Sequence, residues 1–306
     1  LQATMDNMRG WRLVEDNDVQ FWALWQDSDI LAYLFAVIAH REDNRHLMNV
    51  TLHVLPEHRR QGLAKLLLAK ALELADANDR TLLLDATTDR DPAGARFAER
   101  TGARKAMETH TNQLELADLA PEMLREWSEA AKTTASEYRL EFREGPYPEE
   151  ELADITELLN AMNTAPRDEL EVEDFILTPA RMRQWEAYGA AQALTRWALF
   201  ARHLPTAALA GATIVYLDAH NPATLLQDDT VVVPEHRSHG LGKWLKAAML
   251  EKVLLERPEI VRVRTGNADS NGPMLKINHA LGFKPYLAGT VWQVQREAVR
   301  AYLDAG

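Results

Sequence analysis

Two segments of the chain combine glycine with arginine and lysine in a way that suits phosphate binding. Residues 54–65 read VLPEHRRQGLAK and residues 232–243 read VVPEHRSHGLGK, with eight of the twelve positions identical. In the second segment, Gly240 and Gly242 let backbone N–H groups approach a ligand without an intervening side chain. If a helix begins there, its unpaired N–H groups and the positive end of its dipole attract phosphate. A turn without a ligand is the alternative, but the repetition of the pattern favours a pyrophosphate site.

A pair of carboxylates precedes the second of these segments. Asp228 and Asp229 lie at the start of the expected strand that leads to Val233, and alternation places Asp229 and Val233 on one face. A buried carboxylate there would have a raised pKa and could accept a proton from an attacking ammonium group. The matching residue of the first segment is Thr51, which cannot act as a base. The alternative reading of Asp229 is an ordinary strand-initiating aspartate in a turn.

Each candidate phosphate turn needs a strand before it and a helix after it. The residues at 49–54 and 230–233 alternate as strands, and each is followed by a helix whose apolar residues repeat at i, i+3 and i+4. A further strand (81–85 or 260–265) and a helix ending at a glycine come next. This order predicts an α/β fold with parallel strand pairs. The offset of 178 residues is too long for a solenoid repeat, so we expect two copies of one domain.

The two copies differ in what precedes their turns. The second copy has room for two helices, near 149–162 and 178–190, whereas only strands at 19–26 and 30–39 precede the first turn. Either the first copy has lost its leading helices or the chain begins inside it, and the sequence leaves both open. A charged helix with Pro121 near its start is expected to connect the copies. The expected division into a first domain, a connecting helix and a second domain is 1–118, 119–136 and 137–306.

The composition argues against several functional classes. Lys plus Arg total 34 and Asp plus Glu total 46, so the net charge of −12 disfavours nucleic acid and favours a cationic small molecule. The absence of cysteine removes disulfides, thiolate catalysis and Cys-ligated zinc, and the ten histidines have no metal-ligand spacing, so no metal is expected. The longest apolar stretch, Ile30–Ala39, is about half the length of a membrane helix. Since no signal peptide is visible, we expect a cytoplasmic protein that does not enter a membrane.

The Arg-x-x-Gly-x-Gly/Ala turn after a strand ending in Val-x-Pro resembles the acyl-CoA motif of the GNAT superfamily of acetyltransferases. Residues 265–283, TGNADSNGPMLKINHALGF, resemble the next motif of that superfamily, Asn-x-x-Ala-x-x-x-Tyr-x-x-x-Gly-Phe. Two such domains in one chain resemble the tandem arrangement of mycothiol synthase and related actinobacterial proteins. The resemblance implies an α/β fold (α+β, with a mixed sheet) of two tandem GNAT domains, the first degenerate or truncated. It also implies transfer of an acyl group, most simply acetyl, from acyl-CoA to a primary amine of a small molecule by direct attack in a ternary complex.

The resemblance assigns roles to residues of the second copy. Its turn would hold the CoA pyrophosphate through backbone donors, and the strand edge at Val231 and Val233 would pair with the pantetheine arm, with a backbone N–H stabilising the oxyanion. Asn271 would hydrogen-bond the pantetheine, although it also suits a helix N-cap. The residues implied to bind CoA in the second turn are Arg237, Ser238, His239, Gly240, Leu241, Gly242 and Lys243. Their first-copy counterparts are Leu55, Arg59, Gln61, Gly62, Leu63 and Ala64.

The copies also differ in the second motif, where Asp91 and Ala98 of the first copy replace Asn271 and Asn278 of the second. The first copy could still bind CoA but is expected to be the poorer catalyst, so we expect the active site in the second copy. Many members of the superfamily have a tyrosine at the position of Asn278, where it protonates the leaving thiolate, and asparagine cannot do this. Either no acid is needed, because a thiol with a pKa near 8–9 is an adequate leaving group, or another residue such as His279 or Tyr286 supplies the proton.

An acidic segment lies between the two expected leading helices of the second copy. Residues 168–174 read DELEVED and carry five carboxylates in seven residues. The resemblance places this region beside the acceptor site, where it would attract a cationic amine or amino sugar. The residues expected to bind the substrate are Asp168, Glu169, Glu171 and Glu173. The alternative is a solvated acidic loop whose Leu170 and Val172 lie against the body of the domain.

Two other functions stay open on the sequence alone. One is a non-catalytic acyl-CoA-binding or interaction protein, which Ala98 and Asn278 at the usual acid position favour. The other is a tandem transferase that uses aminoacyl-tRNA as donor, which the negative net charge disfavours. The apolar faces are accounted for by packing within the domains, so the sequence leaves the oligomeric state open.

Overall fold

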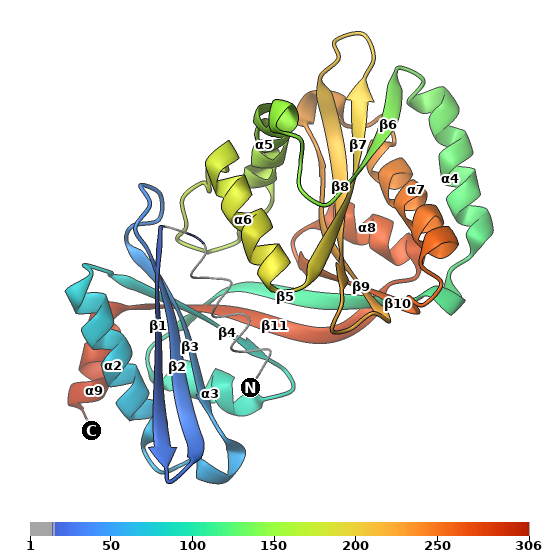
Figure 1. Ribbon diagram of the computed structural model, residues 1–306. Coiled ribbons are helices and arrows are strands. Elements are labelled where there is room, and N and C mark those ends of the chain that lie inside the picture. The colour runs from blue at the N-terminus through green and yellow to red at the C-terminus, as the bar shows by residue number, and fades with distance from the viewer. Residues whose placement is uncertain (1–13, 15, 306) are drawn as a thin grey trace. The chain divides into compact units, whose positions relative to one another are not determined.

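The computed structural model describes residue 14 and residues 16–305, which form two compact units (Figure 1). The first-copy unit comprises the described residues up to 109 together with 167–174 and 287–305. The second-copy unit comprises residues 110–166 and 175–286. No helix in the described part of the chain is long and apolar enough to cross a membrane.

The first-copy unit is a mixed five-stranded sheet packed against helices. Its strands follow the order β1 (Asn17–Gln26), β2 (Asp29–Ala39), β3 (Leu47–Val54), β4 (Leu82–Thr88) and β11 (Lys284–Gln295). In this sheet β3 and β4 pair in parallel, whereas the pairs β1–β2, β2–β3 and β4–β11 are antiparallel. The helices are α2 (Leu63–Ala77), α3 (Pro92–Arg100) and α9 (Arg296–Asp304). The buried face of α2 packs on Leu34, Ile38 and Met48 of the sheet, which form its main core.

The second-copy unit is a six-stranded mixed sheet with helices on both faces. The strand order is β5 (Arg104–Glu115), β10 (Arg262–Ala268), β9 (Thr224–Val232), β8 (Leu209–Asp218), β7 (Leu194–His203) and β6 (Tyr138–Glu144). The helices are α4 (Pro121–Thr134), α5 (Leu152–Asn160), α6 (Pro179–Ala191), α7 (Leu241–Glu256) and α8 (Gly272–Leu281). Residues near 149–162 and 178–190 therefore form helices, as the sequence predicts.

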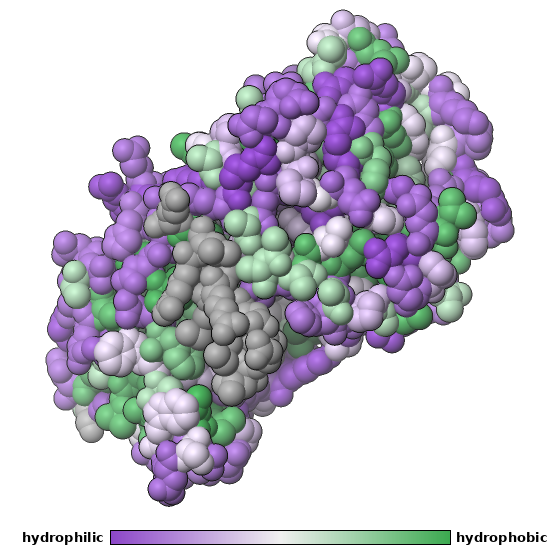
Figure 2. Space-filling model, in the orientation of Figure 1, coloured by the Kyte–Doolittle hydropathy of each residue, from purple (hydrophilic) through white to green (hydrophobic). Residues whose placement is uncertain are grey.

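The two faces of this second sheet carry separate cores. Leu199 and Ala201 of β7 face a core shared with α4 and α7, whereas Ala198 and Phe200 face a core shared with α5 and α6. This alternation is the period of two that a strand covered on both faces requires. Figure 1 shows α5 and α6 on one side of β7 and β8, with α4 and α7 on the other. Figure 2 shows mainly hydrophilic residues over the outer side of α4, whose inward face buries Leu124 and Ala131.

The last strand of each copy completes the sheet of the other. Residues 289–295 of β11 pair with β4, which belongs to the first copy of the repeat. Residues 110–115 of β5 belong to the second-copy unit, where β5 neighbours β10 and Leu116 N donates to Val261 O at 2.9 Å. Neither compact unit is therefore a continuous stretch of the chain. The boundaries at residues 118 and 137 stay a prediction about the two copies of the repeat.

Candidate active site

The turns before α2 and α7 have the same backbone form. In each, a short 3-10 turn (Pro56–His58 or Pro234–His236) follows the strand, and a glycine with positive φ becomes the helix N-cap. Neither N-cap glycine offers a side-chain hydrogen bond to its helix, so the first N–H groups stay available to an anion. The positive φ angles are 64° at Arg60, 83° at Gly62, 68° at Ser238 and 79° at Gly240.

Side chains of the second turn mostly hold the turn itself. Arg237 Nε donates to Val232 O at 3.1 Å, and its Nη2 donates to Thr164 Oγ1 at 2.9 Å. The His239 Nδ1 atom lies 2.9 Å from Arg237 O, and Lys243 Nζ lies 5.2 Å from the centre of the Trp127 ring. Leu241 is buried in the core. These residues therefore offer a ligand mainly backbone donors and two nearby cations.

The parallel strands beside each turn pair only over their first residues. The β9–β10 pairing runs from Thr224 to Gln227 on β9 and stops, although β9 continues to Val232. The β3–β4 pairing likewise stops at Asn49, although β3 continues to Val54. Each sheet thus exposes unpaired strand edge next to the phosphate turn. A peptide-like ligand can add to such an edge.

The register corrects one expectation about this edge. Val233 N donates to Ala210 O of β8 at 3.0 Å, so its backbone faces β8, and alternation turns Val231 the same way. The expectation that Val231 and Val233 present their backbone to the open side is therefore wrong. The backbone of Val232 faces the open side, where its carbonyl oxygen accepts the hydrogen bond from Arg237 Nε. In the first copy, Leu55 N likewise donates to Leu31 O at 3.0 Å.

A β-bulge in β9 distinguishes the second copy. Thr213 of β8 pairs with Thr230, and Val215 pairs with Gln227, so Asp228 and Asp229 together oppose one residue. Such a bulge changes the direction of the side chains of Asp228 and Asp229 and bends the strand. The corresponding β2–β3 ladder is regular through Thr51. The sequence does not reveal the bulge, and its one hint is a pair of consecutive aspartates within a strand.

Both aspartates line a cavity of about 150 Å³ between β9 and the helical face formed by α5 and α6. Burial raises the pKa of Asp229 to about 7, and the negative charge of Asp228 adds to this shift. Burial also raises the pKa of Asp228. Two adjacent carboxylates with raised pKa values can share a proton, which the pair takes up or releases near neutrality. The cavity is lined by Tyr147, Leu159, Asn160, Met162, Asn163, Phe175, Leu177, Met182, Trp185, Arg196, Ile214, Tyr216, Asp228 and Asp229.

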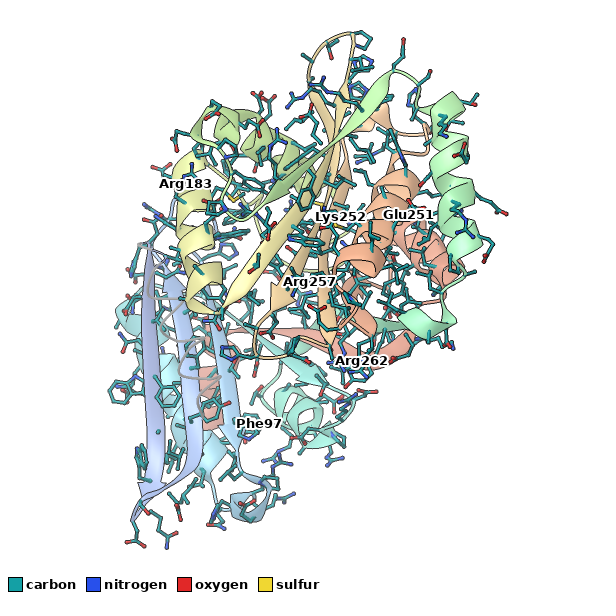
Figure 3. The ribbon with its side chains drawn as sticks, turned by 45° about the vertical axis from the view of Figure 1, so that its right-hand side comes forward. Phe97, Arg183, Glu251, Lys252, Arg257 and Arg262 are labelled. Atoms are coloured by element: carbon teal, nitrogen blue, oxygen red, sulfur yellow. The ribbon has the colours of Figure 1, made fainter. Side chains whose placement is uncertain are left out.

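A buried ion-pair network supports one wall of this cavity. Arg196 Nη2 lies 2.5 Å from Glu186 Oε1, and the Arg196 guanidinium lies 3.4 Å from the centre of the Tyr147 ring. Arg183 on α6 (Figure 3) bonds the other oxygen of Glu186 at 2.6 Å and also pairs with Glu149. Because Glu186 neutralises Arg196, the cavity keeps the negative character of the aspartate pair.

The remaining second-copy candidates lie apart from this cavity. Asn271 is the N-cap of α8, where its Oδ1 accepts from Met274 N at 3.4 Å. Asn278 is fully buried and donates to Asn267 Oδ1 at 2.8 Å. The Tyr286 ring lies 4.2 Å from the Arg264 guanidinium. Neither Asn278 nor Tyr286 lines the cavity that holds the aspartates.

No residue of the acidic segment is among those that line the cavity. Residues 167–174 belong to the first-copy unit, where Leu170 and Val172 pack against Leu47, Leu82 and Leu84. None of Asp168, Glu169, Glu171 and Glu173 lines the cavity, whereas Phe175, which follows the segment directly, does, so their part in binding the acceptor stays a prediction. The packing of Leu170 and Val172 agrees with the alternative of a loop against the body of a domain. Arg104 forms ion pairs with Glu169 and Glu171 of this segment. The Gln293 side chain donates a hydrogen bond to Glu169 O and accepts one from Glu171 N, and the backbone N–H groups of Asn44 and Glu173 each donate to the side chain of the other residue. Asp168 has a positive φ of 49°.

The first copy has its own cavity of about 230 Å³ between the separated ends of β3 and β4. Burial raises the pKa of its Asp85 to about 7, a candidate that the sequence reasoning missed because no motif marks it. At its rim, the Arg59 guanidinium binds the Asp91 carboxylate with both nitrogens, at 2.6 and 3.1 Å. Among the described residues, no group of three or more His, Cys, Asp or Glu is placed to hold a metal ion.

Comparisons with known proteins agree with this architecture. The model of the Acetyltransferase (GNAT) family matches residues 1–103, which lie within the first copy. A tandem GNAT protein from the clavulanic acid biosynthesis pathway is 30% identical, with a TM-score of 0.78 over 95% of this chain and 87% of that one. No curated protein matches the chain significantly.

Two more distant solved structures share the fold. A GCN5-related N-acetyltransferase from Sphaerobacter thermophilus is 13% identical, with a TM-score of 0.60 over 88% of this chain and 78% of that one. Another from Kribbella flavida is 14% identical, with a TM-score of 0.55 over 95% and 94%. The resemblance to mycothiol synthase in particular is not confirmed by these matches.

Proposed function

The chain belongs to the GNAT family of N-acetyltransferases, and from this premise we propose that it transfers an acyl group, most simply acetyl, from acyl-CoA to a primary amine of a small molecule. We place the reaction in the second copy. The observation that carries this placement is the β9 bulge, which brings Asp228 and Asp229 to a cavity. The same strand goes on to the unpaired edge and to the glycine turn before α7. The first copy has a regular strand and Thr51 at the same place.

The residues present fit the donor. The glycine N-cap of α7 leaves helix N–H groups for the pyrophosphate, and Arg237 and Lys243 stand close by. The unpaired edge of β9 suits the amides of pantetheine, with Val232 on the open side. When bound, the donor supplies a thioester carbonyl and a thiolate leaving group.

Asp229 is the proposed general base. An ammonium group must lose a proton before its nitrogen can attack, and a carboxylate with a pKa of about 7 can take that proton at neutral pH. Asp228 shares the charge and the proton with it. The amide of Asn278 is not an acid, and a thiol pKa near 8–9 lets the leaving group depart without a dedicated acid.

Calorimetric titration of acetyl-CoA into the full chain tests the proposal. We expect binding that Gly240→Ala weakens at least tenfold, because both N-cap glycines have positive φ and an added Cβ strains the turn. Gly62→Ala introduces the same strain in the first copy and is the matched control. The proposal fails if acetyl-CoA does not bind, or if the Gly240 variant binds and turns over like the unaltered protein.

A further inference from the structure

We propose that the acceptor in the second copy is a compact cationic amine with an apolar, for example aromatic, body. This inference rests on the proposed function only in taking the aspartate-lined cavity as the acceptor site. The alternatives it excludes are amino sugars with many hydroxyl groups and extended polyamines. Four independent features of the cavity lead to this choice: its charge, its walls, its size and one hydroxyl group.

The charge of the cavity selects a cation. Its charged or titratable lining residues are Tyr147, Arg196, Tyr216, Asp228 and Asp229. Glu186 neutralises Arg196 at 2.5 Å, and both of these side chains are less than one-tenth exposed. Burial raises the pKa of Tyr216 to about 12, so this phenol stays neutral. The aspartate pair is therefore the charge that a ligand meets.

The walls are apolar because their two amides are already used. Asn160 exchanges two hydrogen bonds with the backbone of Leu177, at 3.0 and 2.8 Å. Asn163 does the same with the backbone of Phe175, at 2.8 and 3.1 Å. Because the amides of Asn160 and Asn163 are bonded to the backbone, the wall has few free polar groups that could bind the hydroxyls of a sugar. The remaining wall residues are Leu159, Met162, Phe175, Leu177, Met182, Trp185 and Ile214.

The size of the cavity sets an upper limit on its ligand. Its volume of about 150 Å³ lies below the roughly 300–1,000 Å³ that is typical of sites for drug-sized ligands. The Phe175 and Trp185 rings stack at 5.2 Å and form part of the wall. A single ring or short branched chain bearing one ammonium group matches this space, whereas an extended polyamine exceeds it.

The hydroxyl group of Tyr147 is a further indication of a ligand. Tyr147 is 2% exposed, and its Oη has no hydrogen-bond partner among the described residues. An unpaired buried hydroxyl costs free energy, which a ligand N–H or O–H group bound to it would recover. Tyr147 and the aspartate pair line the same cavity, so we place the polar head group of the ligand between them.

Calorimetric titration of phenethylamine into the full chain at pH 7, with and without saturating CoA, tests the inference. We expect saturable binding at least tenfold tighter than that of glucosamine or spermidine. A bound cation favours the fully ionised aspartate pair, so binding should release protons, measured by comparing buffers of different ionisation enthalpy. Asp229→Asn should weaken phenethylamine at least tenfold and abolish the proton release, and Tyr147→Phe should weaken it by about twofold to tenfold.

Glu171→Gln is the matched control, because it removes a carboxylate from the acidic segment outside the cavity. Thermal unfolding of each variant reports whether it is folded. The inference is overturned if phenethylamine fails to bind in both titrations, if glucosamine or spermidine binds as tightly, or if Asp229→Asn leaves binding unchanged. Because these titrations need no acyl donor, amine binding without acetyl-CoA binding would overturn the proposed function and keep the inference.

Discussion

At the scale of single residues, Asp229 should control the pH dependence of turnover. Its folded pKa of about 7 lies above the ordinary value near 4, so it is a protonated acid below pH 7 and a base above it. We expect kcat/KM to rise with pH through about 7. Asp229→Asn should lower kcat/KM by about 10²–10⁴-fold and remove this rise. Steady-state rates from pH 5.5 to 9 check both effects, with Thr51→Val in the first copy as control. If Asp229→Asn has the same pH profile as the unaltered protein, another residue is the base.

Lys246 is a second residue whose titration should be measurable. It lies on α7 at the position that Leu68 occupies on α2, it is 2% exposed, and burial lowers its pKa to about 7. Between that value and the unfolded pKa near 10.4, the unfolded chain binds more protons, so stability should rise with pH across this window. Lys246→Leu should raise the free energy of unfolding at pH 7 by a few kcal/mol, on the order expected for a buried amine, and flatten the pH dependence. Urea unfolding from pH 6.5 to 10 measures this.

The control for this lysine is Lys276→Leu on α8, which removes the same charge from an exposed position. It should leave the pH dependence of stability in place. Loss of stability in Lys246→Leu at every pH would show that the buried amine makes favourable interactions that outweigh its burial.

At the scale of structural elements, the two phosphate turns share a backbone but differ in one ion pair. In the first copy, Asp91 at the start of α3 binds Arg59 of the turn with two hydrogen bonds, and Arg59 holds the pKa of Asp91 below its usual range. In the second copy, Asn271 takes the place of Asp91, and Arg237 donates to Thr164 and Val232. A phosphate group bound at the first turn would therefore compete with this carboxylate for Arg59.

Asp91→Asn should give the first copy a turn like the second. We expect its affinity for acetyl-CoA to rise about tenfold, because Arg59 is released for a charge-assisted bond to phosphate. Calorimetry in a Gly240→Ala background isolates the first site. Glu99→Gln, which removes an exposed carboxylate from the same α3 helix, should have no effect. An affinity that stays the same or falls in Asp91→Asn would mean that the ion pair does not oppose CoA.

The elements themselves were largely predictable, and the features that need three dimensions were not. The repeated turn predicted both glycine N-caps and the strand and helix on either side, because local pattern decides them. The bulge at Asp228 depends on the register against β8, which no local pattern specifies. The charge of the acidic segment does not reveal that Leu170 and Val172 pack against Leu47, Leu82 and Leu84, because only the fold shows which side chains are buried. Asp85 was missed because only the fold buries it.

At the scale of the whole molecule, the exchange of last strands should make the two copies depend on each other for folding. Residues 289–295 pair with β4, and β5 lies beside β10. A fragment of residues 119–306 keeps the proposed active site but loses β5, and its own last strand loses β4. It would expose unpaired edges on β10 and β11, and such edges favour aggregation.

We therefore expect the 119–306 fragment alone to lack a cooperative thermal transition and to aggregate, whereas co-expression with residues 1–118 should restore both folding and acetyl-CoA binding. Circular dichroism during heating and calorimetry of the co-purified halves measure these two properties. The co-expressed pair is the matched control, since it contains every residue and lacks only the peptide bond after Asp118. If the fragment alone unfolds at the same midpoint as the full chain, each copy folds independently and the exchanged strands add little to stability. If the halves co-purify and bind acetyl-CoA, the pairing of the exchanged strands is strong enough to hold the two copies together without the peptide bond.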